Sequence, residues 1–489
     1  MVNGLQRLEK IVSIAGRFLS VVPAGKLCHL RLGFLLSFLG LLSFTYLLIC
    51  SSSLLGSMRS PRDYAALRSA HIALTGGRNE GGNKTASWRR KAHGVIPIAC
   101  KMEAQESEIM AMDPIKFLRN YKNPCWWERI QTPLSDLYTQ NPYINYSYAI
   151  SKTFQKLRVR WARQKSDTKY RLRCLPYFLL AGQPKCGSTD IYQRLITHPE
   201  IVAPPVKESH WWGKNRYGPV SSGNHSPGWL LHSTENIPLS HYVDLFDRSA
   251  VHINEIREES GDGFIHPAIT GDGSVSTLWS NDDWWKNPEN CGLSEPRYTN
   301  AHHVHKLIPQ AKIIVILRNP VDRLYSDFLY FQKTAKARDH FHKASVQAID
   351  ALEECVQIFG IRSCVYNYTT ASKSRARLRL GLYSVFLQEW LSVFPRDQIL
   401  VVRLEDYSVA PLKTISRVYK FLGLKSLSAE EAEDVLEKPV ANPRRAQDKK
   451  IGKMLPETRA LLTTFYYKYN VQLARLLDDG RFLWDDPDL

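Results

Sequence analysis

Three short apolar runs, at 177–181, 312–317 and 398–403, are each followed by polar or basic residues. A continuous apolar run of this length is typical of a β-strand that is buried on both faces, as in a parallel sheet. The segments between the runs carry the periodicity of amphipathic helices. We therefore predict an α/β domain over 175–489, with a central parallel sheet flanked by helices.

The residues after the second run predict a helix that begins at Pro320, a residue suited to a first helical position. Apolar residues then recur at helical spacing: Val321, Leu324, Tyr325, Phe328 and Leu329. Ligands of parallel sheets gather at the carboxyl ends of strands, which is where Arg318 lies. Together with Ser326 on the helix, Arg318 is suited to hold a phosphate. Taken alone, an arginine at this position is more often part of a surface salt bridge, and the phosphate role of Arg318 is favoured only together with the phosphate loop described below.

A longer apolar run, 32–50, lies near the N-terminus and contains no charged residue. Its length suits one helical crossing of a bilayer of roughly 30 Å. The segment before it has five basic residues and one acid, Glu9, which predicts a cytosolic tail over 1–31, a signal anchor over 32–52 and a luminal remainder. A cleaved signal peptide is the alternative, although the run is longer and farther from the start than such peptides require.

The composition changes twice between this anchor and the α/β domain. Residues 53–110 contain paired glycines and little periodicity, as a flexible stem does. Residues 111–174 form a basic and aromatic extension of the luminal domain, in which 152–173 holds nine basic residues and one acid, Asp167. This stretch is either a solvated helix face or a track for a sulfated or carboxylated polymer.

The whole chain is strongly basic, with a net charge of +18 at pH 7. This charge implies an acidic partner such as nucleic acid, anionic lipid or a polyanionic glycan. A luminal position argues against nucleic acid. Four N-x-S/T sequons agree with that position: Asn83, Asn145, Asn224 and Asn367.

Six cysteines lie beyond the anchor and outside the phosphate loop described below: Cys100, Cys125, Cys174, Cys291, Cys355 and Cys364. In an oxidising compartment six cysteines suffice for three disulfides. We predict only one pair, Cys355 with Cys364, because these residues are close enough in the chain to close a surface loop. The other pairings stay open.

The stretch Gly182-Gln-Pro-Lys-Cys-Gly-Ser-Thr189 follows the first apolar run and precedes an amphipathic segment. This order predicts a strand, a phosphate-binding turn and a helix N-terminus, whose N–H groups suit an anion. The glycine spacing is that of an ATP-binding P-loop, but Ser188 stands where that loop has its lysine. The lysine here is Lys185, inside the turn, which argues against a nucleotide kinase or triphosphatase and favours a sulfonate donor.

Segments 183–189 and 318–326 together resemble the two phosphate-binding signatures of sulfotransferases that use 3′-phosphoadenylyl sulfate (PAPS). The resemblance implies a P-loop-like sulfotransferase fold, PAPS as co-substrate and no metal. It assigns the 3′-phosphate to Arg318 and Ser326. It assigns the 5′-phosphosulfate to the first loop, through Lys185, Cys186, Gly187, Ser188 and Thr189.

Two further elements extend the resemblance. The sequence Lys207-Glu-Ser-His-Trp-Trp212 is similar to an element of Golgi glycosaminoglycan sulfotransferases, with Ser209 in place of proline. There the glutamate is the general base, which implies this role for Glu208, with His210 as the rival base and with Lys207, His210 and Trp211 at the substrate. Trp211 is alternatively a core residue. A late basic loop with Arg444 and Arg445 resembles the segment that closes over the nucleotide, although structural salt bridges are an alternative.

Within this family, 177–489 is most similar to enzymes that act on the 6-hydroxyl of N-acetylgalactosamine 4-sulfate in chondroitin or dermatan sulfate. The resemblance implies a Golgi type II membrane enzyme with a luminal catalytic domain and a sulfated galactosaminoglycan as partner. A homodimer is one option for its assembly. The alternatives are a sulfotransferase for heparan sulfate or an N-glycan, and a glycan-binding membrane protein without activity.

Overall fold

The computed structural model describes residues 109–165, 168–217, 236–261, 263–332, 336–367 and 374–485. All of them belong to one compact unit, Lys84–Leu489. No helix within these ranges is long and apolar enough to cross a bilayer. The predicted tail, anchor and nearly all of the stem lie outside the described residues, as do the sequons Asn83 and Asn224, so the membrane anchor stays a prediction.

The core of the unit is a parallel sheet with the strand order β6-β3-β7-β8. Its strands are β6 (Gly271–Asp272), β3 (Phe178–Gly182), β7 (Lys312–Leu317) and β8 (Ile399–Arg403). The last three are the predicted apolar runs, and all but one of their residues are buried. The predicted parallel sheet is therefore confirmed. Strand β6 was not predicted, because two residues carry no periodic signal.

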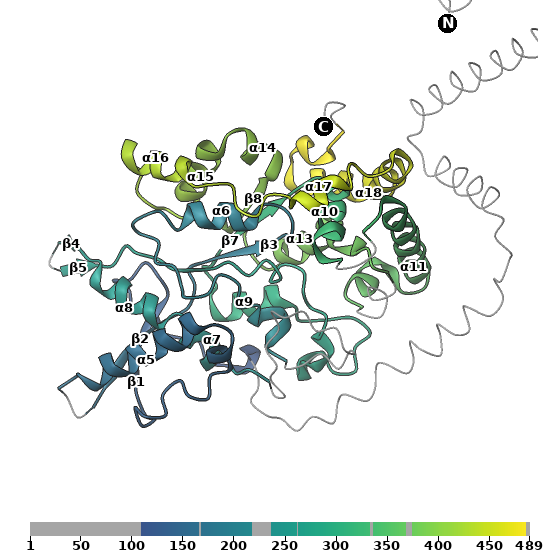
Figure 1. Cartoon of the computed structure of the whole chain (residues 1–489). Coiled ribbons are helices and arrows are strands. Elements are labelled where there is room, and N and C mark those ends of the chain that lie inside the picture. Colours follow the sequence, from purple (N-terminus) through teal and green to yellow (C-terminus); the bar gives the residue numbers. More distant parts are fainter. Residues whose placement is uncertain are drawn as a thin grey trace, which may run out of the picture. The chain divides into compact units, whose positions relative to one another are not determined.

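Helices α6 (Ser188–Leu195) and α15 (Pro411–Phe421) cover one face of the sheet, and α9 (Asn300–Leu307) and α13 (Tyr383–Leu391) lie on the other side (Figure 1). On the first face, apolar side chains of both helices pack against alternate residues of β3, β7 and β8 in one buried cluster. This is the arrangement expected for strands that are buried on both faces.

The remaining helices lie around this sandwich. The predicted helix after β7 is α10 (Pro320–Phe331), and the Asn319 side chain accepts a hydrogen bond from the Val321 N–H at 3.0 Å. Later helices are α11 (Arg338–Val365), α14 (Leu404–Val409), α16 (Ala429–Glu437), α17 (Ala446–Lys450) and α18 (Pro456–Leu477). Earlier ones are α5 (Tyr148–Ala162), α7 (Leu239–Asp244) and α8 (Asp247–Glu255).

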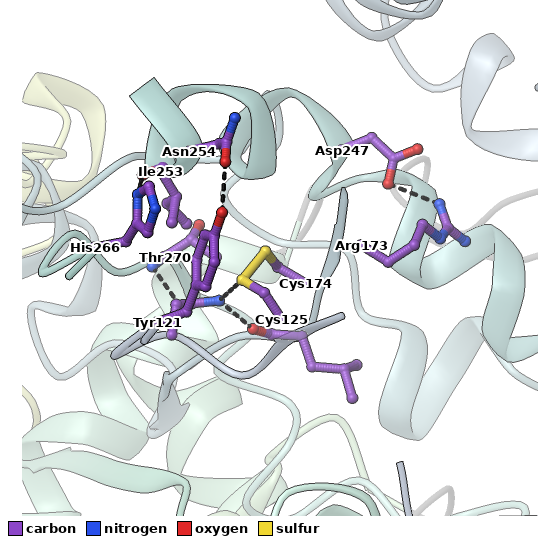
Figure 2. The surroundings of a disulfide bond; sticks show 11 residues. Tyr121, Cys125, Arg173, Cys174, Asp247, Ile253, Asn254, His266 and Thr270 are labelled. Carbon is purple, nitrogen blue, oxygen red and sulfur yellow. Dashed lines mark hydrogen bonds and ion pairs between the residues drawn. A yellow bond between two sulfur atoms is a disulfide. The ribbon is translucent and has the colours of Figure 1, made fainter. Parts of the chain in front are cut away.

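The extension before β3 pairs β1 (Cys125–Arg129) with β2 (Tyr170–Cys174) in an antiparallel ribbon. A short ribbon of β4 (Glu258–Ser260) and β5 (Gly263–Ile265) follows α8. Strand β1 is joined to β2 by a disulfide between Cys125 and Cys174 (Figure 2). The sequence left this pairing open, since nothing in the spacing of the two cysteines indicates it.

The end of the basic stretch 152–173 is not a surface track. Arg173 is 1% exposed and contacts Asp244 and Asp247 at 2.7 Å each, and Figure 2 shows the second of these contacts. Arg171 is buried on the same side of β2 and reaches the same two aspartates. Residues two apart on a strand share a face, so these two arginines are structural, and the exposed cations that remain free for a polymer lie on α5 and in the residues directly after it.

The predicted disulfide between Cys355 and Cys364 is confirmed, and it lies within α11 on either side of a kink at Gly360. Cys291 is disulfide-bonded as well. Cys100 lies outside the described residues.

The two disulfides with both partners described should differ in their contribution to stability. Cys125 and Cys174 are 49 residues apart and Cys355 and Cys364 are 9 apart, and the longer closed loop restricts the unfolded chain more. Replacing the first pair by serine should cost about 4 kcal/mol and the second about 2.5 kcal/mol. Thermal unfolding of the two double variants tests this order, and an equal or larger loss for the second pair would contradict it.

Candidate active site

The turn between β3 and α6 has the geometry predicted for a phosphate-binding loop. Gly187 adopts a φ of 85°, and a Cβ there would lie 2.7 Å from Leu404 Cδ1. Only glycine fits this position without strain. Ser188 and Thr189 begin α6, and their hydroxyls make no hydrogen bond with any described residue. The first N–H groups of α6 therefore have no side-chain cap and are free to bind an anion.

Lys185 lies inside this turn, also with a positive φ, of 67°. Its Nζ atom lies 3.6 Å from the centre of the Tyr330 ring, on the last turn of α10. This contact connects the loop after β3 to the helix after β7. The two predicted phosphate motifs therefore meet at the carboxyl edge of the sheet.

Four cationic side chains share this edge. Burial lowers the pKa of Lys185, and although Asp327 raises it, Arg445, Arg318 and Arg377 lower it further. Those effects require the three guanidinium groups to be close to the Lys185 ammonium. Like charges gathered in this way, only partly offset by Asp327 and Asp448, suit the binding of an anion.

Arg318 and Ser326 occupy the positions predicted for the second phosphate. Both are half-buried, and neither side chain makes an ion pair or hydrogen bond with a described residue. The backbone around Arg318 is fixed, because the Tyr383 hydroxyl donates to the Arg318 carbonyl at 2.9 Å and the Asn319 N–H donates to Glu405 at 2.8 Å. A fixed backbone with free side-chain donors suits the binding of an anion.

Sequence reasoning missed Arg377. Its guanidinium makes two hydrogen bonds to Asp327, one of them 2.8 Å from Nε to Oδ2, and it lies 4.0 Å from the centre of the Phe331 ring. Asp327 and Phe331 both belong to α10. Arg377 follows a segment without a strong periodic pattern, so no signal in the sequence marked it.

The late basic loop lies against the same helix. Arg445 makes an ion pair with Asp448 at 2.8 Å and donates to the Tyr330 carbonyl at 3.2 Å. Arg444 is exposed, with its guanidinium 5.8 Å from the centre of the Tyr325 ring. Arg445 thus makes a structural salt bridge, which was the alternative role for this loop. The guanidinium of Arg444 is exposed to solvent.

The element that carries the predicted base is a compact ionic cluster. Glu208 contacts the Lys207 ammonium through Oε1 and lies 3.0 Å from His210 Nε2 through Oε2. Burial by itself raises the pKa of Glu208, but the hydrogen bond to His210 and the charge of Lys207 outweigh it and lower the pKa to about 2. Glu208 is therefore a carboxylate at any physiological pH.

The surroundings distinguish Glu208 from His210. The second ring nitrogen of His210, Nδ1, lies 2.8 Å from the Ser276 hydroxyl. The His210 side chain is 7% exposed, compared with 29% for Glu208. Because both nitrogens of His210 have partners inside the protein, Glu208 is the group of the two that an incoming hydroxyl is better able to reach.

Trp211 and Ser209 belong to the interior. Trp211 is 1% exposed, its ring stacks on Tyr242 at 4.8 Å, and its indole N–H donates to the Ile237 carbonyl at 2.8 Å. Ser209 donates to Asp272 at 3.2 Å. The structure places Trp211 in the core, the alternative stated for it.

The cluster around Glu208 lies at the same edge of the sheet as the phosphate loop. Strand β6 pairs with β3, with Asp272 opposite Leu179, and the Gly273 N–H donates to the Lys207 carbonyl at 3.1 Å. The Lys207 ammonium lies 5.8 Å from the centre of the Tyr192 ring on α6, the helix that the loop begins. The Glu208 carboxylate and the cations around Lys185 therefore lie at the same edge of the sheet.

Comparison with known proteins agrees with this geometry. Residues 175–450 match the family model described as a sulfotransferase domain. Carbohydrate sulfotransferase 15 from Homo sapiens is 37% identical over 396 residues, which cover 80% of this chain and 69% of that protein. The chain belongs to the sulfotransferase family. The same identity and coverage hold for carbohydrate sulfotransferase 15 from Mus musculus.

A more distant relative is the bifunctional heparan sulfate N-deacetylase/N-sulfotransferase 2 of Homo sapiens. It is 23% identical over 329 residues, which cover 65% of this chain and 30% of that protein. Among solved structures, the sulfotransferase from Alicyclobacillus acidocaldarius is 22% identical, with a TM-score of 0.41 over 62% of this chain and 96% of that one. The predicted resemblance to carbohydrate sulfotransferases is confirmed by the family model and the 37% identical relatives, and the enzyme is a PAPS-dependent sulfotransferase.

The described residues fit this donor. PAPS carries two anionic ends, and the sulfotransferase has two sets of unpaired donors, one at the start of α6 and one at Arg318 with Ser326. The cations around Lys185 suit the donor's negative charge. Within the ranges that the structure describes, no group of three or more His, Cys, Asp or Glu side chains is placed to hold a metal ion.

The pKa of Glu208 gives a test of the ionic cluster. Because this pKa is lowered from 4.5 to about 2, the cluster contributes stability above about pH 4.5 and loses it as the pH falls toward 2. His210→Ala removes the hydrogen bond and leaves the burial, so the pKa of Glu208 should rise. The acid limb of the kcat/KM profile should then move up by about one pH unit or more.

The control for this profile is Ser276→Ala, which keeps the contact between His210 and Glu208 and should move the acid limb less. If the acid limb of the dependence of kcat/KM on pH lies at the wild-type position in both variants, His210 does not set the charge state of Glu208.

The second anion site gives a separate test. Arg318→Ala should weaken binding of adenosine 3′,5′-bisphosphate by roughly 10- to 100-fold, since a charge-assisted hydrogen bond is lost. Binding of adenosine 5′-phosphate should change much less. Calorimetry with both nucleotides measures this, with Arg417→Ala on α15 as an exposed control. An equal loss for both nucleotides would show that Arg318 does not recognise the 3′-phosphate.

Proposed function

We propose that this sulfotransferase transfers a sulfonate group from PAPS to the 6-hydroxyl of N-acetylgalactosamine 4-sulfate in chondroitin or dermatan sulfate. The observation that carries the proposal is the ionised Glu208, held between Lys207 and His210 at the sheet edge that also bears Lys185. Similarity to carbohydrate sulfotransferase 15 supports a carbohydrate acceptor. The choice of sugar and hydroxyl rests on the sequence motifs described above.

The donor is assigned to the two anion sites. The N–H groups of Cys186, Gly187, Ser188 and Thr189, with the Lys185 ammonium, hold the 5′-phosphosulfate end. Arg318 and Ser326 hold the 3′-phosphate. Arg444 closes the site from the late basic loop, which Arg445 anchors through Asp448, and Arg377 adds positive charge beside Lys185. When bound, PAPS supplies an activated sulfonate.

Glu208 acts as the general base. As the acceptor oxygen forms its bond to sulfur and the bond from sulfur to the phosphate oxygen breaks, the hydroxyl proton passes to a Glu208 carboxylate oxygen. Lys185 stabilises the charge that develops on the departing phosphate oxygen. The hydrogen bond from His210 keeps the carboxylate oriented, so His210 is a positioning residue, and Trp211 supports this loop from the core.

Lys207 has two anionic neighbours in this mechanism. In the free enzyme its ammonium pairs with Glu208 and thereby helps to keep the pKa of that carboxyl low. A carboxylate with so low a pKa is a weak base. When the acceptor's sulfate or the donor draws Lys207 away, the pKa of Glu208 rises and its basicity increases, so that proton abstraction is favoured once the substrates are in place.

The site of action is the Golgi lumen, with residues 32–52 as the membrane anchor. Support comes from the basic tail before that segment and from the disulfides of the luminal unit, which persist in oxidising compartments. The exposed side chain of Asn145, in one of the sequons, also suits this compartment.

Glu208→Gln tests the assignment of the base. The variant keeps the shape of the side chain but cannot accept the proton, so kcat on chondroitin 4-sulfate should fall by about 100-fold or more. Its affinity for adenosine 3′,5′-bisphosphate should stay within about twofold, because the anion sites are intact. The assay uses labelled PAPS and a panel of chondroitin, dermatan, heparan and N-glycan acceptors, with disaccharide analysis of the products.

His210→Gln is the matched variant for this assay. It should lower kcat less than Glu208→Gln does, as befits a positioning residue. Full activity of Glu208→Gln would remove the base assignment, and transfer by the wild-type enzyme to heparan sulfate or an N-glycan alone would replace the proposed acceptor.

A further inference from the structure

The solvent side of α5, with the C-cap residue Arg163, carries a row of basic side chains. Lys152, Lys156, Arg160 and Arg163 follow one another at intervals of three or four residues, and all four are exposed. Side chains at this spacing lie along one side of a helix. The opposite side of α5 packs into the domain through Ile150, Phe154, Leu157 and Trp161.

Most of this positive charge is not offset locally. Arg160 makes an ion pair with Glu255 at 3.0 Å, and both side chains are about half exposed. Lys152, Lys156 and Arg163 make no ion pair with any residue in the described ranges. A folded surface that keeps three such cations together attracts a polyanion.

One end of the row lies beside the catalytic base. The Tyr143 hydroxyl donates to the Ser209 carbonyl at 2.8 Å, and the Tyr146 hydroxyl donates to the Glu208 carbonyl at 3.3 Å. Ser147 then caps α5, and Tyr148, its first residue, is 80% exposed. The helix thus starts at the Glu208 loop and leads away from it for about 22 Å, the length of 15 residues.

The other end of the row opens on a pocket of about 320 Å³ between α5, α8 and the β1–β2 ribbon. Arg160 and Arg163 line it together with Trp127, which is 49% exposed, and Asn254. The Asn254 side-chain oxygen accepts a hydrogen bond from Tyr121, which leaves its amide nitrogen pointing away from that tyrosine (Figure 2). The pocket therefore combines an aromatic face, cationic side chains and the polar side chain of Asn254.

We propose that the α5 row and the Trp127 pocket form an extended binding site for a sulfated galactosaminoglycan chain whose acceptor sugar lies at Glu208. The inference rests on the proposed function. Sulfates and carboxylates recur along such a chain, as the cations recur along α5. The apolar faces of sugar rings suit the exposed rings of Tyr148 and Trp127. One exposed ion pair contributes little, but several along one chain add up.

This site gives the enzyme a preference for long acceptors. In the full-length enzyme, replacing Lys152, Lys156 and Arg163 together by alanine should raise KM for long chondroitin 4-sulfate chains by roughly fivefold to tenfold. KM for a chondroitin 4-sulfate hexasaccharide, KM for PAPS and kcat should change less than about twofold. The increase of KM with salt should become shallower for the long chains only. Trp127→Ala should raise KM for long chains in the same selective way.

The matched control replaces Lys343, Arg417 and Lys420 by alanine, exposed cations on α11 and α15 that also make no ion pair with described residues. It removes the same charge and should leave the ratio of the two acceptor KM values unchanged. The inference is overturned if the α5 variant equals this control, or if it raises KM for hexasaccharide and long chain alike.

Two further outcomes are distinguishable. Should the α5 variant lose binding to vesicles of anionic lipid while its KM for long chains stays at the wild-type value, the row is a membrane-contact surface and the proposal is wrong. If wild-type enzyme sulfates neither the hexasaccharide nor the long chain, the proposed function itself has failed. Transfer to the hexasaccharide by both variants shows that the catalytic assignment stands whatever becomes of the extended site.

Discussion

Repulsion of the Lys185 ammonium by Arg318, Arg377 and Arg445 is the constraint on which the active site depends. Two carboxylates offset part of this charge, Asp327 beside Arg377 and Asp448 beside Arg445, and the remaining cations are held together by the backbone that carries them. The sheet supplies this, because β3 and β7 end side by side and each continues into a helix. An anionic ligand relieves the repulsion, so the folded protein is already complementary to the charge of its donor.

Several long-range contacts keep the pieces of this edge in register. The Asp190 carboxylate on α6 accepts a hydrogen bond from the Ala441 N–H at 2.8 Å, and the Tyr325 hydroxyl on α10 donates to the Gly452 carbonyl at 2.9 Å. The late basic loop is thereby attached to both helices that follow the phosphate motifs. The two arginines of this loop have different surroundings: Arg445 makes structural contacts, and Arg444 is exposed to solvent.

Much of this arrangement was predictable from the sequence, because several short local patterns are each typical of a single structural element. Apolar runs predicted β3, β7 and β8, and a glycine-bounded turn before an amphipathic segment predicted the loop around Lys185. Arg377 was not predictable, because its role depends on Asp327, fifty residues earlier. Arg173 was expected either on a solvated helix face or on a polymer track, and it lies on neither, because a run of basic residues does not reveal which of them a strand turns inward toward distant aspartates.

The Cys125–Cys174 bridge closes a covalent ring that contains all of α5. A protease that cuts the chain once anywhere inside this ring produces two fragments that stay joined through sulfur. The helix that starts at the Glu208 loop is thus retained on the enzyme after such a cut, and the fragments separate only once the bridge is reduced. Formation of the Cys125–Cys174 bridge therefore also protects the protein against the loss of the segment that carries α5.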